Sequence, residues 1–358
     1  MRSHLLLMRR AVLSRENASN TLLPSEWSTK TMTSSRLERS IPSTNTCVID
    51  AESSAALARL VDQPEPLNEG EVRRQLMLSH HLSEALGGSV PVTLGDLTTV
   101  HTVLDVACGA GGWALDLACA YPRLEVTGID ACTRSIASAQ RLASDGGFSN
   151  VCFLVHDPRE VQKIDDQLPG APFDLIHVAF VAPTLLSMDS SAWLRALSRL
   201  CRPGGTVCWT ETEFPITNSS ALERLIALTC HALDLAECRC TPLSLPTHAE
   251  HILRRQLGIT PMLGSWFHAA GYQQVQQVLT AIEVSAGMEA HLCFVLQAEI
   301  FVRQIRPFLL AQGVVTEDAF EQLCTQVEGE VQQDTFCGLC FLFSVLGQKP
   351  GAGNAAPL

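Results

Sequence analysis

Positive charge is scarce in this sequence. Its 358 residues include 25 Lys and Arg against 37 Asp and Glu, which leaves a formal net charge of -12 at pH 7. The first forty residues hold seven of the basic residues and only three acidic ones, so the rest of the chain is more acidic still. Proteins that bind nucleic acid normally present a basic surface that neutralises phosphates. The composition therefore disfavours a nucleic-acid partner and favours a small-molecule one.

Long apolar runs are also missing. No segment approaches the ~18–20 apolar residues that span a bilayer, and the opening MRSHLLLMRR has too short an apolar stretch for a signal peptide. We therefore expect no membrane span and a cytoplasmic protein whose oligomeric state the sequence leaves open. Whether residues 1–48 are a targeting segment, a tail or an over-extended start is equally open.

Paired cysteines are few, although the chain has 14 Cys. Most lie singly in apolar segments, where a free thiol behaves as a small hydrophobic side chain. Only Cys337 and Cys340 have the C-x-x-C spacing, and Cys238 and Cys240 do not, whereas a structural zinc site needs two such pairs or a pair of histidines. We expect no metal and no disulfide framework.

Composition divides the chain into three parts. Residues 1–48 are rich in polar residues without periodicity, which predicts a disordered tail. Residues 49–98 show two apolar patterns of helical period separated by prolines, the second over 70–86. Residues 99–349 read as one folded domain.

Strands and helices alternate through the first half of that domain. Five strands are predicted, at 100–107, 124–130, 151–157, 173–180 and 205–211. Helices are predicted between them, at 112–120, 133–143 and 192–201. Further helices are predicted at 221–235, 263–270, 288–311 and 317–332, and further strands at 272–285 and 336–350. This alternation predicts an α/β fold, a Rossmann-like seven-stranded sheet with helices on both faces and helical insertions at about 212–260 and 288–332.

The informative segment is VLDVACGAGGWALDLACAYPRLEVTGID. Gly109 and Gly111 form a turn between a strand and a helix, where backbone can approach a ligand. Asp130 ends the next strand, where a carboxylate can hold a ribose. With Ala114, these residues also satisfy the dinucleotide fingerprint G-x-G-x-x-G/A. Asp105 breaks the tie, because an acid four residues before the turn suits a cationic amino-acid group better than a pyrophosphate.

These residues resemble class I S-adenosylmethionine-dependent methyltransferases. The resemblance continues through LVHD, FDLIHVAF and LSRLCRPGGTV, across roughly residues 100–212, and is best to the group of the ubiquinone- and menaquinone-biosynthesis enzymes. It implies S-adenosyl-L-methionine as the cofactor. The residues that it implies for cofactor binding are Asp105, Ala107, Cys108, Gly109, Gly111, Asp130, Ala131, Asp157 and Pro158. One departure is Ala107, where the family often has glycine.

Catalytic residues are harder to identify, because methyl transfer depends heavily on positioning and desolvation. His177 and Glu211 lie near the carboxyl ends of predicted strands, where such sheets bind ligands, and each is a weak candidate for a general base. Glu213, His80 and His81 are weaker still. All five have an equally physical structural interpretation. Trp113 either lies beside the cofactor or packs in the core.

The resemblance implies methyl transfer, and the negative charge together with the apolar insertions favours a small, apolar metabolite as the acceptor. Two alternatives stay open: an NAD-dependent oxidoreductase with the same glycine turn, and a non-catalytic S-adenosylmethionine-binding protein. We also expect the helix at 70–86 and the insertion at 212–260 to form an apolar lid over the acceptor, or else to extend the core.

Overall fold

A computed structural model describes residues 69–85, 97–164, 168–181, 189–236 and 259–351, all of which belong to one compact unit, Cys47–Leu358. The predicted tail at 1–48 lies outside the described residues. So do the first of the two predicted N-terminal helices and almost all of the segment at 241–260.

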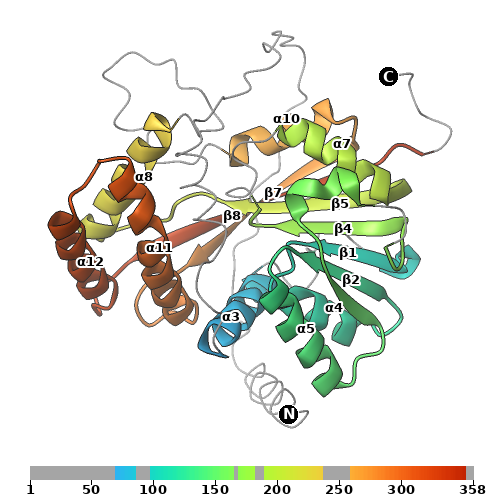
Figure 1. The fold of residues 1–358 in the computed structure, drawn as a ribbon, viewed down its shortest axis with the longest axis horizontal. Helices are drawn as coiled ribbons and strands as arrows, with labels where there is room; N and C mark the ends of the chain where they lie inside the picture. The colour runs from blue at the N-terminus through green and yellow to red at the C-terminus, as the bar shows by residue number, and fades with distance from the viewer. Residues whose placement is uncertain (1–68, 86–96, 165–167, 182–188, 237–258, 352–358) are drawn as a thin grey trace, which may run out of the picture. The chain divides into compact units, whose positions relative to one another are not determined.

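An eight-stranded sheet forms the centre of this unit (Figure 1). Its strands are β1 Thr102–Val106, β2 Glu125–Asp130, β3 Val151–Val155, β4 Phe173–Ala179, β5 Cys201–Thr212, β6 Ile216–Thr217, β7 Gln273–Glu283 and β8 Gly338–Gln348. The first five are parallel in the order β3-β2-β1-β4-β5, and β8 then pairs antiparallel with β5 on one side and β7 on the other. The predicted Rossmann-like fold is confirmed. The eighth strand is the two-residue β6, which follows β5 along the same edge of β8.

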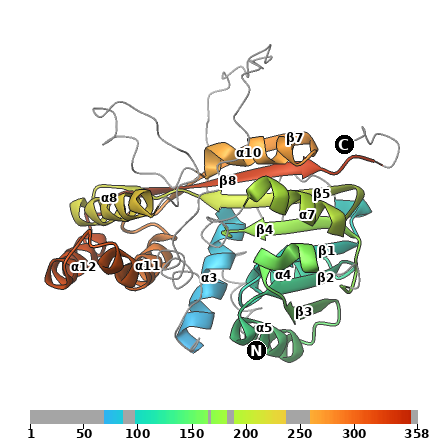
Figure 2. The same cartoon turned by 45° about the horizontal axis from the view of Figure 1, so that its top comes forward.

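Helices cover both faces of the sheet (Figure 2). They are α3 Glu69–Ala85, α4 Gly112–Ala120, α5 Thr133–Gly146, α7 Ser190–Leu200, α8 Ser220–Leu235, α10 Thr260–Ala269, α11 His291–Ala311 and α12 Glu317–Val331, with 3-10 turns η2 Leu97–Thr99 and η3 Pro158–Lys163. One face carries α4 and α5 with α3 beside them, and the other carries α7 and α10. Within the described residues, no helix has both the length and the apolar character that a membrane span requires.

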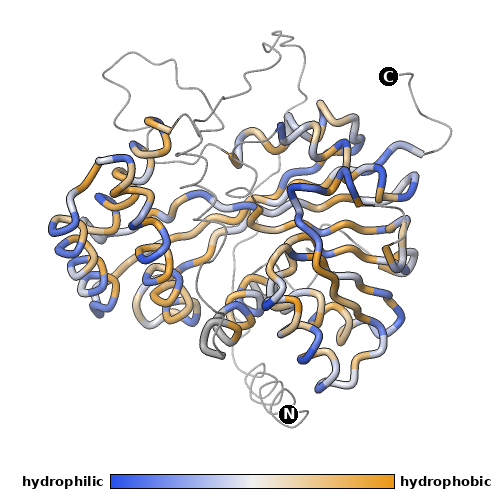
Figure 3. The backbone as a smooth tube through the Cα atoms, viewed as in Figure 1, coloured by the Kyte–Doolittle hydropathy of each residue, from blue (hydrophilic) through white to orange (hydrophobic). Residues whose placement is uncertain are grey.

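Alternation along the central strands assigns each side chain to one of these two layers. Val103 and Leu175 belong to the core beneath α4 and α5, whereas Leu104 and Ile176 belong to the core beneath α7 and α10. These buried strands are predominantly apolar in Figure 3. Asp105 is a charged residue within the apolar stretch of β1, and its side chain points to the same face of the sheet as that of Val103. Its side chain therefore faces the layer of α3 and α4.

A second core lies at one end of the sheet. There α8 packs against α11 and α12, and their apolar faces bury a cluster that includes Leu225, Phe308 and Phe320 (Figure 1). The insertion at 212–260 was expected to cover the acceptor, but its described helix, α8, extends this separate core instead. The buried apolar face of α8 packs against the buried faces of α11 and α12. Residues 237–258 of that insertion lie outside the described residues.

Candidate cofactor and active site

The glycine turn after β1 adopts backbone angles that side chains resist. Gly109 has φ of 55°, Gly111 of 81° and Ala107 of 60°. A Cβ added to Gly111 would lie 2.6 Å from the Phe153 ring. Glycine is therefore required at Gly111 on two grounds, conformation and space, whereas Ala107 holds the left-handed conformation despite its methyl group.

Asp130 shapes the same turn from the end of β2. Its Oδ2 accepts a hydrogen bond from the Gly109 N–H at 2.9 Å, and its Oδ1 accepts from the Cys132 N–H at 2.8 Å. Burial raises the pKa of Asp130, and the two backbone hydrogen bonds partly offset this effect. The carboxylate thus fixes the turn and remains at the carboxyl edge of the sheet, where a ribose would be expected.

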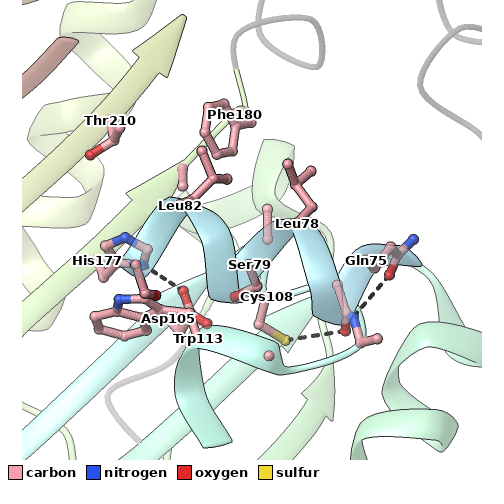
Figure 4. A pocket seen from close by; sticks show the side chains of 16 residues that line it. Gln75, Leu78, Ser79, Leu82, Asp105, Cys108, Trp113, His177, Phe180 and Thr210 are labelled. Carbon is pink, nitrogen blue, oxygen red and sulfur yellow. Dashed lines mark hydrogen bonds and ion pairs between the residues drawn. The ribbon is translucent and has the colours of Figure 1, made fainter. Parts of the chain in front are cut away.

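A cavity of about 170 Å³ lies between α3 and the carboxyl ends of β1, β4 and β5 (Figure 4). The predicted residues Asp105, Ala107, Cys108, Gly109, Trp113 and His177 line it. The Cys108 side chain is partly buried within the turn, and desolvation raises the pKa of its thiol well above the usual value. Its sulfur is thus held as a neutral packing group.

Asp105 and His177 meet at the floor of the cavity because β1 and β4 place them in register. The His177 Nδ1 lies 2.8 Å from the Asp105 Oδ1, and the imidazole stacks on Trp113 with ring centroids 3.8 Å apart and planes 13° apart. The Asp105 Oδ2 is buried without a hydrogen-bond partner among the described residues. Desolvation raises the pKa of Asp105, and its hydrogen bond to His177 opposes that rise.

An unpartnered carboxylate oxygen in a cavity is costly unless a donor arrives. The α-ammonium group of an amino acid is such a donor, and it would convert the uncompensated atom into a charge-assisted pair. The residues present therefore fit the methionine part of S-adenosylmethionine.

Five predicted cofactor residues do not line the cavity: Gly111, Asp130, Ala131, Asp157 and Pro158. Asp157 begins η3 by accepting from the Arg159 N–H at 2.8 Å, and it forms an ion pair with the Arg159 guanidinium. Desolvation alone would raise the pKa of Asp157, but the hydrogen bonds from Arg159 lower it. Pro158 is buried and its carbonyl accepts from the Trp193 indole N–H at 2.7 Å. A role of Asp157 or Pro158 in adenine binding stays a prediction.

Glu211 and Glu213 do not line the cavity. Glu211 shares the parity of Trp209, whose indole N–H donates to Oε1 at 2.7 Å, so it faces the layer of α7 and α10. Glu213 accepts from the N–H groups of Ile259 and Thr260 and thus supports the start of α10. His80 and His81 also lie outside the cavity lining.

Replacing Glu211 with alanine tests its structural role. We expect the free energy of unfolding to fall by about 1–3 kcal/mol, because a buried indole N–H loses its acceptor. The affinity for S-adenosylhomocysteine should stay within twofold of the wild type. Urea denaturation and calorimetry measure the two quantities, and a tenfold loss of affinity at unchanged stability would contradict this placement.

The helix at 70–86 was expected to cover the acceptor, but the α3 residues that line this cavity were not identified from the sequence. Gln75 accepts from the Ala110 N–H at 3.2 Å, and a Cβ on Gly112 would lie 2.8 Å from the Ser79 Cβ. The helical spacing that predicted α3 also indicates this face. The α3 residues that line the cavity are Gln75, Leu78, Ser79, Leu82 and Ser83. Ala179 at the end of β4, Phe180 directly after it and Thr210 in β5 also line the cavity.

Comparison with known proteins agrees with this geometry. Residues 103–205 match a family model described as a methyltransferase domain. The ribosomal RNA small subunit methyltransferase G of Alkalilimnicola ehrlichii is 32% identical over 161 residues, which cover 44% of this chain and 64% of that protein. The demethylmenaquinone methyltransferase of Bacillus subtilis is 30% identical over 113 residues, 31% of this chain and 46% of the relative. The chain thus spans less than two thirds of the length of either protein.

Solved structures with a similar arrangement include the YcgJ protein of Bacillus subtilis, with 17% identity, a TM-score of 0.44 and coverage of 76% of this chain and 100% of the other. A second is phosphoethanolamine N-methyltransferase 2 of Haemonchus contortus in complex with phosphomonomethylethanolamine and S-adenosylhomocysteine. It has 14% identity, a TM-score of 0.44 and coverage of 82% and 60%. At these TM-scores neither structure carries an argument about this chain.

The glycine turn and the Asp105 and Asp130 carboxylates all lie within the segment that the family model matches. Residues 103–205 thus form a methyltransferase domain by similarity.

Proposed function

We propose that this protein transfers a methyl group from S-adenosylmethionine to a small, largely apolar acceptor. The observation that carries the proposal is the Asp105 Oδ2, a buried carboxylate oxygen without a partner among the described residues, beside a left-handed glycine turn. The bound cofactor would supply an electrophilic methyl group on a sulfonium. The protein would supply position and exclusion of water.

Asp105 and Asp130 would bind different parts of the cofactor. Asp105 would accept the cofactor ammonium, and Asp130 would hold the ribose while its hydrogen bond keeps Gly109 in place. The cavity is smaller than the ~300–1,000 Å³ typical of small-molecule sites. We therefore infer that α3 shifts outward when cofactor and acceptor are both bound.

The walls of the cavity favour a small acceptor. Leu78, Leu82 and Phe180 contribute apolar surface, and the net charge of -12 opposes a polyanionic substrate. The names of the relatives point in different directions, one to ribosomal RNA and one to demethylmenaquinone. The charge of this chain supports the latter kind of acceptor.

Thermal stabilisation distinguishes the proposal from an NAD-linked activity. At a concentration 100 times its dissociation constant, S-adenosylhomocysteine should stabilise the protein by about 2.7 kcal/mol, seen as a rise in Tm. The same concentration of NAD⁺ should produce no rise. Stabilisation by NAD⁺ alone would overturn the proposal, whereas stabilisation by S-adenosylhomocysteine without methyl transfer to any acceptor would favour a non-catalytic binding protein.

A further inference from the structure

The cavity has two chemically different ends along α3 (Figure 4). At one end Gln75 contacts the glycine turn through Ala110, where the cofactor is expected. At the other end Leu82 lies beside Phe180 and above His177. This second end is not needed to explain cofactor binding.

His177 presents one ring nitrogen to that second end. Its Nδ1 is engaged by the Asp105 carboxylate at 2.8 Å, which in the neutral ring places the proton on Nδ1 and leaves Nε2 as an acceptor. Within the described part of the chain, the ring makes no hydrogen bond through Nε2. Stacking on Trp113 fixes the plane of the ring. The imidazole is thus oriented as a base that lacks only a proton donor.

The cavity lining near Leu82 and Phe180 is mostly apolar. Leu78, Leu82 and Phe180 form the walls, and the Ser83 Oγ, on a residue that is 6% exposed, is buried without a partner in the described structure. The Thr210 hydroxyl is already paired with the Ser344 hydroxyl at 2.8 Å. Two polar atoms, the His177 Nε2 and the Ser83 Oγ, are therefore left for a ligand of mostly apolar body.

Phe180 contributes an aromatic side chain to this end of the cavity. An aromatic ligand can pack on such a ring in an offset-stacked or edge-to-face arrangement.

We propose that Leu78, Leu82, Ser83, His177 and Phe180 form an acceptor subsite for a phenol-like aryl alcohol, and that His177 is the catalytic residue that removes its hydroxyl proton. This proposal rests on the proposed function. Asp105 is then a positioning residue for the imidazole.

The step is balanced as an O-methylation. The acceptor oxygen forms a bond to the methyl carbon while the methyl–sulfur bond breaks, and the sulfur keeps that electron pair. The hydroxyl proton moves to the His177 Nε2. The products are an aryl methyl ether, S-adenosylhomocysteine and an imidazolium, whose charge Asp105 stabilises before the proton leaves to water.

Two acceptors of different acidity test whether His177 acts as a general base. With the full chain and S-adenosylmethionine, His177→Gln should lower kcat for phenol about 100-fold. For thiophenol, which is largely ionised at neutral pH, kcat should change less than threefold. Ser83→Ala is the matched control: it should raise KM for both acceptors by a similar factor and leave the ratio of their kcat values unchanged. Equal loss of kcat for phenol and thiophenol in His177→Gln would overturn the proposal.

Binding gives a readout that is independent of turnover. Calorimetry on the protein loaded with S-adenosylhomocysteine should show phenol binding about fivefold more tightly than anisole, because anisole cannot donate to Nε2. His177→Gln should abolish this preference while its melting curve and its S-adenosylhomocysteine affinity match the wild type. If His177→Gln alters the melting curve or the S-adenosylhomocysteine affinity, the ratio of the phenol and anisole affinities of the wild type alone tests the proposal. Absence of phenol binding to the loaded wild type sinks this proposal only, whereas failure to bind S-adenosylhomocysteine sinks the proposed function.

Discussion

Replacing Asp105 with asparagine should weaken S-adenosylhomocysteine binding more than 100-fold, which corresponds to about 3–5 kcal/mol for truncating one partner of a buried charge pair. Asparagine keeps the size of the side chain and can still accept from the His177 Nδ1. It removes the negative charge at the oxygen that we expect to meet the cofactor ammonium. Calorimetric titration measures the loss.

The same substitution should stabilise the ligand-free protein at neutral pH. Desolvation raises the pKa of Asp105 above its ordinary value of 3.8, because burial penalises the ionised carboxylate in the folded state. The stability linked to this group is present below pH 3.8 and is lost as pH rises through the raised pKa. The free energy of unfolding of Asp105→Asn relative to the wild type should therefore increase as pH rises above 3.8, as urea denaturation at a series of pH values from 3.8 upward would show.

A matched control is Asp145→Asn, on the exposed side of α5. It removes the same charge and should change neither the affinity nor the pH dependence. If Asp105→Asn bound S-adenosylhomocysteine as tightly as Asp145→Asn does, the assignment of Asp105 to the cofactor would be wrong.

Gly111→Ala should lower the free energy of unfolding by about 3 kcal/mol. Left-handed backbone costs an alanine about 1–2 kcal/mol, and forcing a methyl group into a packed site costs typically about 1–3 kcal/mol more. The methyl group would lie 2.6 Å from the Phe153 ring and 3.0 Å from the Ala139 Cβ. Urea denaturation of the free protein tests this value.

Gly271→Ala separates the cost of the left-handed backbone from the cost of packing the added methyl group. Gly271 has φ of 88° but no atom within 4 Å of the added Cβ, so only the backbone cost of about 1–2 kcal/mol should appear. Phe153→Leu should in turn recover part of the loss in Gly111→Ala, with a coupling of about 1 kcal/mol in the double-mutant cycle. Equal losses at Gly111 and Gly271 would show that packing against Phe153 is unimportant.

The sheet could be predicted because its strands are continuous apolar runs interrupted by turn residues. The glycine turn also followed from local chemistry, since Asp105, Gly109 and Gly111 lie within seven residues of one another. The start of β5 was harder to predict from the sequence. That strand begins at Cys201, before Pro203 and Gly204, because Cys201 pairs with Phe173 across an irregular register.

Residues that meet only through tertiary packing could not be found in the same way. Glu211 was a candidate base from its position at a strand end, but its parity relative to Thr210 sends it to the opposite face. Gln75 and Ser83 belong to no motif, and they reach the cavity because α3 packs against α4, an element that begins 27 residues after α3 ends. The face of the sheet to which a side chain points decides whether it reaches the cavity, and a sequence motif does not specify that face.

The position of β8 has a consequence for biosynthesis. Within the described sheet β7 pairs only with β8, and 54 residues lie between the end of β7 at Glu283 and the start of β8 at Gly338. At ribosomal speeds of 5–20 residues per second, β7 waits roughly 3–11 s for its partner. The helices α11 and α12 are made in that interval, and both can already pack on α8. Until β8 emerges, the backbone N–H and C=O groups of β7 lack their partner strand, and unpaired strands of this kind can pair with other chains.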